Sequence, residues 1–233
     1  GDTALDSVQS AGTYNTAIGH NALTANTTGQ YNVAMGAFAL DANTTADDNT
    51  AVGTSALTAN TTGASNTALG ADSLLANTTA SNNTAVGYHA GLSVTTGAGN
   101  TFMGSASGDA VTTGAQNTFV GQASGTAVTT GANNVAIGYI ALASATTAAD
   151  NVIVGKQAGF NITDSQYNVG IGNNALQTLT TGDSNVAVGH SAMYGLTTAS
   201  NNTAVGYNAL VSNTTASNNT AVGYQAGYSF TTG

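Results

Sequence analysis

The sequence predicts an all-β fold, a parallel β-solenoid built from seventeen-residue coils. The segment Asn-Thr-Ala-Val-Gly and its close variants recur at one fixed spacing without a slip, which indicates a repeat architecture. Glycine recurs too often, and β-branched residues crowd the segment before it, so a helix cannot run through the unit. The thirteen units begin at Asn15, Asn32, Asn49, Asn66, Asn83, Asn100, Asn117, Asn134, Asn151, Asn168, Asn185, Asn202 and Asn219.

The first half of the unit predicts a strand and a corner. We number the positions of each unit from one, the starting asparagine, to seventeen. Position two is Thr or Val, position four is aliphatic or Met, and position five is Gly in all thirteen units. Positions one to four therefore predict a short strand, and the glycine predicts a corner with positive φ or close backbone approach. Positions twelve to fourteen, usually ending in Thr-Thr, predict a second short strand, with a second corner at fifteen to seventeen.

Positions nine and twelve vary together. Glycine at position nine accompanies a large apolar residue at position twelve, and leucine at nine accompanies asparagine at twelve. The first type comprises Gly91 with Val94, Gly108 with Val111, Gly125 with Val128, Gly159 with Ile162 and Gly227 with Phe230. The second type comprises Leu23 with Asn26, Leu40 with Asn43, Leu57 with Asn60, Leu74 with Asn77 and Leu210 with Asn213. We infer that both positions fill one core space, because an empty cavity costs a few kcal/mol. Each unit must then close on itself as a coil.

Stacked coils place identical residues in columns about 4.8 Å apart. Each strand pairs in parallel with the equivalent strand of the following unit. The position-one asparagines predict a side-chain amide ladder, and the position-thirteen threonines predict a hydroxyl ladder. We interpret both columns as structural.

The repeat runs through the chain without a composition break, which predicts one domain over residues 1–233. Residues 1–14 form an irregular leading coil, and residues 15–233 hold the thirteen repeats, the last one truncated. If positions two and four face the interior, the position-three alanines form an apolar stripe outside, which three chains around an axis would bury. Phe102 and Phe119 also stand at position three, and their large side chains fit poorly between closely packed chains. We therefore expect self-association, either as a homotrimer or end to end as a fibre.

Composition excludes several classes of function. The chain has no cysteine, and Lys156 is its only base in a net charge of −9, so we expect no nucleic-acid partner. No apolar run is long enough to cross a membrane, so we expect no membrane insertion. His20, His89 and His190 lie too far apart in a stacked rod to meet. We expect no catalytic residue, no metal site and no cofactor; the protein is not expected to be an enzyme.

The pattern Asn-[Thr/Val]-Ala-[Val/Ile]-Gly-x-x-Ala resembles the head repeat of YadA-like trimeric autotransporter adhesins. It is also similar to arrays in bacterial and phage tail-fibre-like proteins, which the segment from Asn202 to Leu210 matches residue for residue. The resemblance implies a left-handed β-roll, a homotrimer, and a location outside the cell, on the cell surface or on a virion. It implies a structural and adhesive fibre segment for surface attachment or host recognition. The alternative is a phage tail-fibre shaft.

Two sets of candidate site residues lie at the corners. Asn82, Asn201 and Asn218 begin Asn-x-Thr sequons and are candidate N-glycosylation sites. The sequons at position twelve would be inaccessible if that position faces the core. The tyrosines at position six are candidate contacts for a surface glycan or a host receptor; they are Tyr88, Tyr139, Tyr207 and Tyr224.

A function of another class is ice binding, which flat solenoid faces with threonine columns can support. The two threonines of each unit are adjacent in sequence, so only one of them would face outward in a strand. A single threonine column is expected, rather than two.

Overall fold

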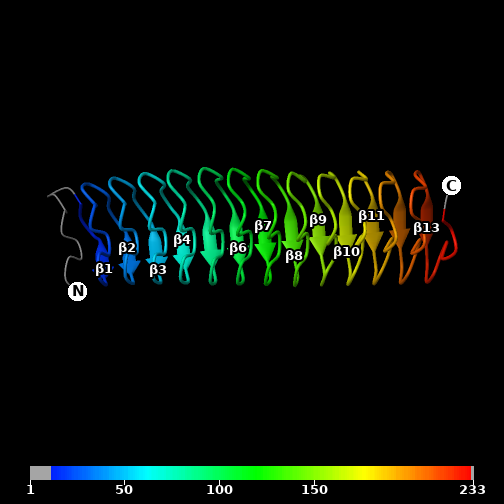
Figure 1. Cartoon of the computed structure of the whole chain (residues 1–233), viewed down its shortest axis with the longest axis horizontal. Coiled ribbons are helices and arrows are strands. Elements are labelled where there is room, and N and C mark those ends of the chain that lie inside the picture. The colour runs from blue at the N-terminus through cyan, green and yellow to red at the C-terminus, as the bar shows by residue number, and fades with distance from the viewer. Residues whose placement is uncertain (1–11, 232–233) are drawn as a thin grey trace. The chain divides into compact units, whose positions relative to one another are not determined.

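The computed structural model describes residues 12–231, so most of the leading coil expected at residues 1–14 lies outside the described residues. The chain divides into two compact units, residues 1–116 and 117–233, and each is a parallel β-solenoid. From here on, "unit" means one of these two parts, and a seventeen-residue element is called a repeat. Within each unit, successive strands lie side by side in chain order (Figure 1). Among the described residues there are strands, turns and bends but no helix.

The first unit contains six three-residue strands, each at positions two to four of a repeat. They are β1 (Thr16–Ile18), β2 (Val33–Met35), β3 (Thr50–Val52), β4 (Thr67–Leu69), β5 (Thr84–Val86) and β6 (Thr101–Met103). Each strand pairs in parallel with the next one, and every residue faces its counterpart in the following repeat. The predicted first strand is confirmed, although it covers positions two to four and not position one, and the predicted register is confirmed.

The second unit repeats this arrangement with seven strands. They are β7 (Thr118–Val120), β8 (Val135–Ile137), β9 (Val152–Val154), β10 (Val169–Ile171), β11 (Val186–Val188), β12 (Thr203–Val205) and β13 (Thr220–Val222). Their pairing is again parallel, consecutive and in register.

The second predicted strand is wrong. Positions twelve to fourteen form a bend, in which the N–H groups of Thr27 and Thr28 both donate to the carbonyl of Thr44, at 2.8 and 3.2 Å. In a strand, successive hydrogen bonds go to different residues of the neighbouring strand, whereas here two consecutive N–H groups share one carbonyl. The rest of the coil also turns, with positions seven, nine and seventeen at φ near +60°, as in Asn21, Leu23 and Tyr31. Repeated left-handed residues close each short coil.

Glycine at position five is explained by the stacking of the coils. Gly36 has φ +138°, and a Cβ built on it would lie 2.4 Å from the carbonyl oxygen of Gly53 in the next coil. Any side chain there would collide with backbone that cannot move. The prediction of positive φ and close approach is confirmed.

The interior of each coil is filled from positions three, eight, nine and twelve. Ala34, Ala51 and Ala68 at position three are fully buried, as are Leu23 at nine and Val94 at twelve. A Cβ on Gly159 would lie 2.9 Å from Ile162 Cδ1, so positions nine and twelve do share one space, as predicted.

Position three also belongs to that space, which overturns the orientation considered for the strand. The position-three residues point inward, and positions two and four lie outside. A Cβ on Gly125 would meet Phe119 Cδ2 at 2.4 Å, so the aromatic ring occupies the volume that a position-nine side chain would need. The apolar stripe expected outside at position three does not exist, and Phe102 and Phe119 are fully buried.

Candidate interaction surfaces

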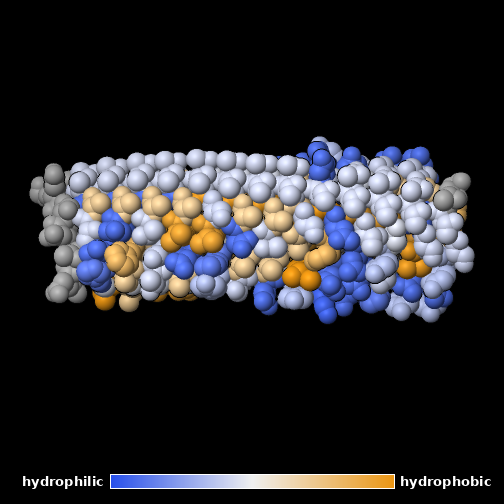
Figure 2. Space-filling model, viewed as in Figure 1, coloured by the Kyte–Doolittle hydropathy of each residue, from blue (hydrophilic) through white to orange (hydrophobic). Residues whose placement is uncertain are grey.

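A continuous apolar surface follows the outward positions of the strands. We call positions two and four of β1–β6, and those of β7–β13, the strand face of each unit. Position two holds Thr or Val, and position four holds Val, Ile, Leu or Met, with no charged residue in either column. The most exposed aliphatic residues at position four include Ile18 (55%), Leu69 (48%) and Met103 (43%). The face drawn in Figure 2 is different in pattern, with hydrophobic clusters separated by hydrophilic residues.

The position-one asparagines form the predicted amide ladder. Just before β4, the Asn66 side chain donates to Asn49 Oδ1 at 3.1 Å and to the Ala80 carbonyl at 2.9 Å. The Asn66 backbone N–H donates to the same Asn49 Oδ1 at 3.0 Å. Buried polar groups are thus paired along the column, which makes it a structural element.

A second, shorter ladder occupies position twelve of the first unit. The side chains of Asn43, Asn60 and Asn77 each donate to the equivalent asparagine of the preceding coil, at 3.0–3.1 Å. The ladder stops where Val94 replaces asparagine, and Asn77 Oδ1 is left buried without a hydrogen-bond partner. These asparagines are fully buried, so their sequons are inaccessible in the folded protein.

The threonine columns differ from the predicted hydroxyl ladder. At position thirteen the Thr61 hydroxyl donates to the carbonyl of Thr78 in the next coil, at 3.0 Å, so the acceptor is backbone and not another hydroxyl. At position fourteen, Thr28, Thr45 and Thr62 are exposed. The first unit therefore carries one exposed threonine column at this corner, whereas Asp164 interrupts the equivalent column of the second unit.

The candidate glycosylation sites lie at position seventeen. Asn82, Asn201 and Asn218 are exposed, with φ of 62°, 60° and 64°. Their backbone N–H groups donate to carbonyls of the preceding coil, at 3.1–3.2 Å, while their side chains are free to project into solvent. The geometry is compatible with modification, which stays a prediction.

The four candidate ligand-contact tyrosines are all exposed, but their surroundings differ. Tyr88 stacks on His89 at 3.7 Å. Tyr207 is stacked between His190 and Tyr224, at 5.2 and 5.5 Å. Both faces of the Tyr207 ring are therefore covered, whereas Tyr139 has no aromatic neighbour among residues 12–231. A role in ligand contact stays a prediction for all four.

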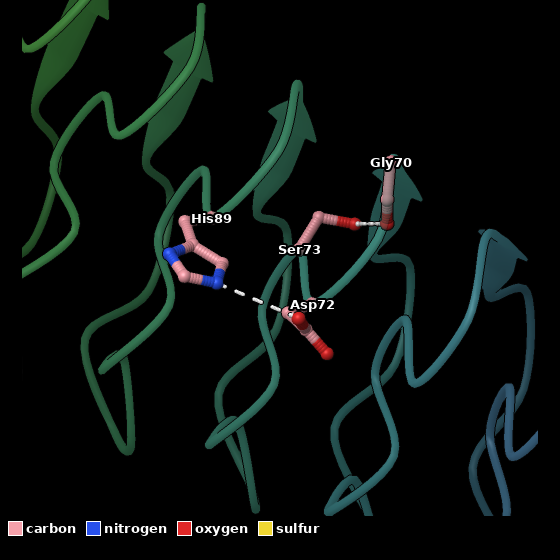
Figure 3. Close-up of polar contacts among 4 residues, drawn as sticks. All are labelled: Gly70, Asp72, Ser73 and His89. Atoms are coloured by element: carbon pink, nitrogen blue, oxygen red, sulfur yellow. Dashed lines mark hydrogen bonds and ion pairs between the residues drawn. The ribbon is translucent and has the colours of Figure 1, made fainter.

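Among residues 12–231, the His and Asp side chains form no cluster of three or more that could hold a metal ion. His89 Nε2 lies 3.5 Å from Asp72 Oδ2 on the neighbouring coil, beside the Ser73 hydroxyl that donates to the Gly70 carbonyl (Figure 3). Nor do residues 12–231 contain a helix that is long and apolar enough to cross a membrane.

A scan against protein-family models finds no matching family, and searches of curated proteins and of solved structures find no match. The assignment of a function therefore rests on the sequence pattern and on the surfaces described above.

The orientation of the strand could have been found in the sequence. The large position-three residues Phe102, Phe119 and Ile153 occur only in repeats with glycine at position nine. Conversely, the repeat with Gly170 at position three has Leu176 at position nine. Such compensation indicates a shared core. Position four, by contrast, changes between Val, Ile, Leu and Met without compensation, as expected of a surface position.

Proposed function

We propose that this chain is a structural and adhesive segment of an extracellular fibre, and that it associates with further copies of itself along the strand face. The observation that carries the proposal is the uncharged, aliphatic position-four column exposed in both units. It includes Met35 at 40% and Ile137 at 39% exposure.

The strand face forms a continuous strip in each unit. Six strands spaced about 4.8 Å apart, with outward columns about 7 Å apart, give this strip an area of roughly 200 Å² in the first unit. A contiguous, uncharged strip with an apolar column along its whole length is a candidate site of contact with another molecule.

Further copies of the same chain are the occupants that fit best. The net charge of −9 makes identical chains repel each other over most of their surface, and the uncharged strand face is where they can approach. Each copy presents the same columns at the same spacing, so coils of neighbouring copies align. The resemblance to trimeric adhesin heads favours three copies around an axis parallel to the stacking direction.

The adhesive part of the proposal uses the corner that follows each strand. Exposed tyrosines at position six, such as Tyr139 at 48% exposure, supply an amphipathic ring for a glycan or a receptor. A location on a cell surface or a virion follows from the same resemblance. A tail-fibre shaft, with recognition carried elsewhere, is the alternative within this architecture.

Ice binding is a second candidate, favoured by the exposed position-fourteen threonines, which repeat at coil spacing in Thr28, Thr45 and Thr62. A single column offers less lattice contact than two. Thermal hysteresis in dilute solution tests it, and its absence would remove the candidate.

Equilibrium sedimentation at micromolar concentration tests the main proposal. We expect the native chain to sediment as a trimer and the double variant Ile137→Lys/Ile171→Lys to sediment as a monomer, because desolvating lysine in the interface is costly. The matched control is Gln122→Lys, at a corner outside the strand face, which should stay trimeric. A native chain that is monomeric, or a double variant that stays trimeric, would refute self-association through this face.

A further inference from the structure

Two tyrosine pairs stack between consecutive coils. Tyr14 and Tyr31 have ring centroids 5.1 Å apart and planes inclined by 2°. Tyr207 and Tyr224 have centroids 5.5 Å apart and planes inclined by 12°. In both pairs the two residues are one repeat apart in sequence and occupy the same repeat position. The pairs belong to different units, so the arrangement occurs twice independently.

Both pairs are open to solvent. Tyr14 and Tyr31 are 74% and 54% exposed, and Tyr207 and Tyr224 are 46% and 73% exposed. The two rings of each pair are nearly parallel and lie about one coil spacing apart. Exposed side chains can rotate and bring the ring carbons next to the two hydroxyls together.

We propose that these two pairs are sites of intramolecular dityrosine cross-linking, formed by a haem-peroxidase-type oxidant with hydrogen peroxide. The oxidant removes one electron and one proton from each phenol. The two phenoxyl radicals join through the ring carbons next to their hydroxyls, forming one carbon–carbon bond. The hydrogens on those carbons shift to the phenolic oxygens and restore both aromatic rings. Hydrogen peroxide takes up the two electrons and two protons and leaves as two water molecules.

The link would add a covalent connection between consecutive coils. Consecutive coils are held by hydrogen bonds and packing, and the absence of cysteine excludes disulfides. A dityrosine at Tyr207 and Tyr224 joins two consecutive coils covalently and restricts the unfolded chain. This inference goes beyond the proposed function and does not depend on it.

The other tyrosines provide internal controls. They are Tyr88, Tyr139, Tyr167, Tyr194 and Tyr228, all exposed, and none of them stacks on another tyrosine among residues 12–231. If exposure alone governed coupling, these five would react like the pairs. If stacking governs it, intramolecular links form at the pairs only.

The experiment treats the intact chain, at low concentration, with a peroxidase and hydrogen peroxide. Because Lys156 is the only lysine or arginine, trypsin then divides the unfolded product into residues 1–156 and 157–233. Each fragment contains one pair. We expect dityrosine fluorescence, and each fragment should lose the mass of two hydrogen atoms without joining another chain.

Matched phenylalanine variants keep the stacked ring and remove the phenol. Tyr224→Phe should abolish the mass loss in residues 157–233, and the control Tyr228→Phe should keep it. Tyr31→Phe should abolish the loss in residues 1–156, and the control Tyr88→Phe should keep it. The proposal is overturned if the losses persist in Tyr224→Phe and Tyr31→Phe. It is equally overturned if the native chain forms no link while N-acetyltyrosine in the same mixture couples.

Discussion

The backbone N–H of Asn83 donates to the side-chain oxygen of Asn66 at 3.0 Å, which ties two consecutive coils together inside a fully buried column. The same Asn66 side chain donates to the Ala80 carbonyl at 2.9 Å. One side chain therefore satisfies backbone groups at two points, and no shorter residue could do both.

Replacing this asparagine tests the ladder. Asn66→Ala leaves the Asn83 N–H buried without its partner, whereas the Ala80 carbonyl keeps the hydrogen bond from the Asn77 side chain at 3.0 Å. An unpaired buried group costs about 1–3 kcal/mol, so we expect a loss of that size in the free energy of unfolding, measured by urea denaturation. Thr79→Ala, at the exposed position fourteen, should change stability by less than about 0.5 kcal/mol. Equal effects of the two variants would contradict a structural ladder.

The shared core space predicts a compensating exchange in the second unit. Ile153→Ala removes a fully buried side chain and should cost about 2–5 kcal/mol. Gly159→Leu alone should also destabilise, because its Cβ would lie 2.9 Å from Ile162 Cδ1 and 3.2 Å from Ile153 Cδ1. The double variant resembles the coil in which Ala187, Met193 and the position-twelve Leu196 pack together, and should recover most of the loss in thermal denaturation. Additive losses would show that the two positions do not share space.

Side chains at position sixteen cap the preceding coil, and the cap can be extended. Ser81 Oγ accepts the Ala64 N–H at 3.0 Å, but Ala98 offers no oxygen to the Ser81 N–H. We expect Ala98→Ser to stabilise the protein by about 0.5–1.5 kcal/mol and Ser81→Ala to destabilise it by a similar amount. Calorimetry measures both. A loss of stability in Ala98→Ser would contradict the assigned role of this corner.

Backbone strain at position seven gives a further prediction. Ile140 is a β-branched residue at φ 48°, whereas Asn174 and Asn208 hold the same position at 59° and 53°. Asparagine tolerates this conformation better, so Ile140→Asn should raise stability by about 1 kcal/mol. The reverse exchange, Asn174→Ile, should lower it. If Ile140→Asn lowered the melting temperature, burial of Ile140 would outweigh the strain.

Exposure predicts which sequons can be modified. When the chain is produced in a host that glycosylates Asn-x-Thr, we expect glycans on the exposed Asn82, Asn201 and Asn218. We expect none on the fully buried Asn43 and Asn60 of a folded product. Intact mass above 22.6 kDa, followed by glycopeptide mapping, measures this. Glycans on Asn60 in folded protein would contradict the burial of position twelve.

Much of the fold was predictable because the same residue types recur at the same positions in thirteen repeats. The strand at positions two to four, the corner at position five, the amide ladder and the space shared by positions nine and twelve all follow from residue types that recur in place. Glycine at position five, for example, has one physical explanation, the close carbonyl of the next coil.

The features that were predicted wrongly depend on direction and curvature. Alternation along a strand separates position three from two and four without saying which side is inside, and only the compensation between positions three and nine carries that information. Thr-Thr has strand propensity, yet at Thr27 and Thr28 the coil must turn, and tertiary closure overrides propensity. To predict that Tyr207 and Tyr224 stack, one would need to know which corner of the coil their column occupies. The residue pattern of the repeat does not identify a partner or a ligand.

The account depends on equivalent residues of consecutive repeats lying side by side on the outer surface of each unit, and paired cysteines test this most directly. The chain has no native cysteine, so the variant Thr50→Cys/Thr67→Cys introduces one pair at registered Cα partners of β3 and β4. The control Thr50→Cys/Thr84→Cys separates the thiols by two coils, about 9.6 Å, which is beyond disulfide reach. Under mild oxidation we expect an intrachain disulfide in the first variant and free thiols in the second. A disulfide in the second variant, or its absence in the first, would contradict the stacked-coil account.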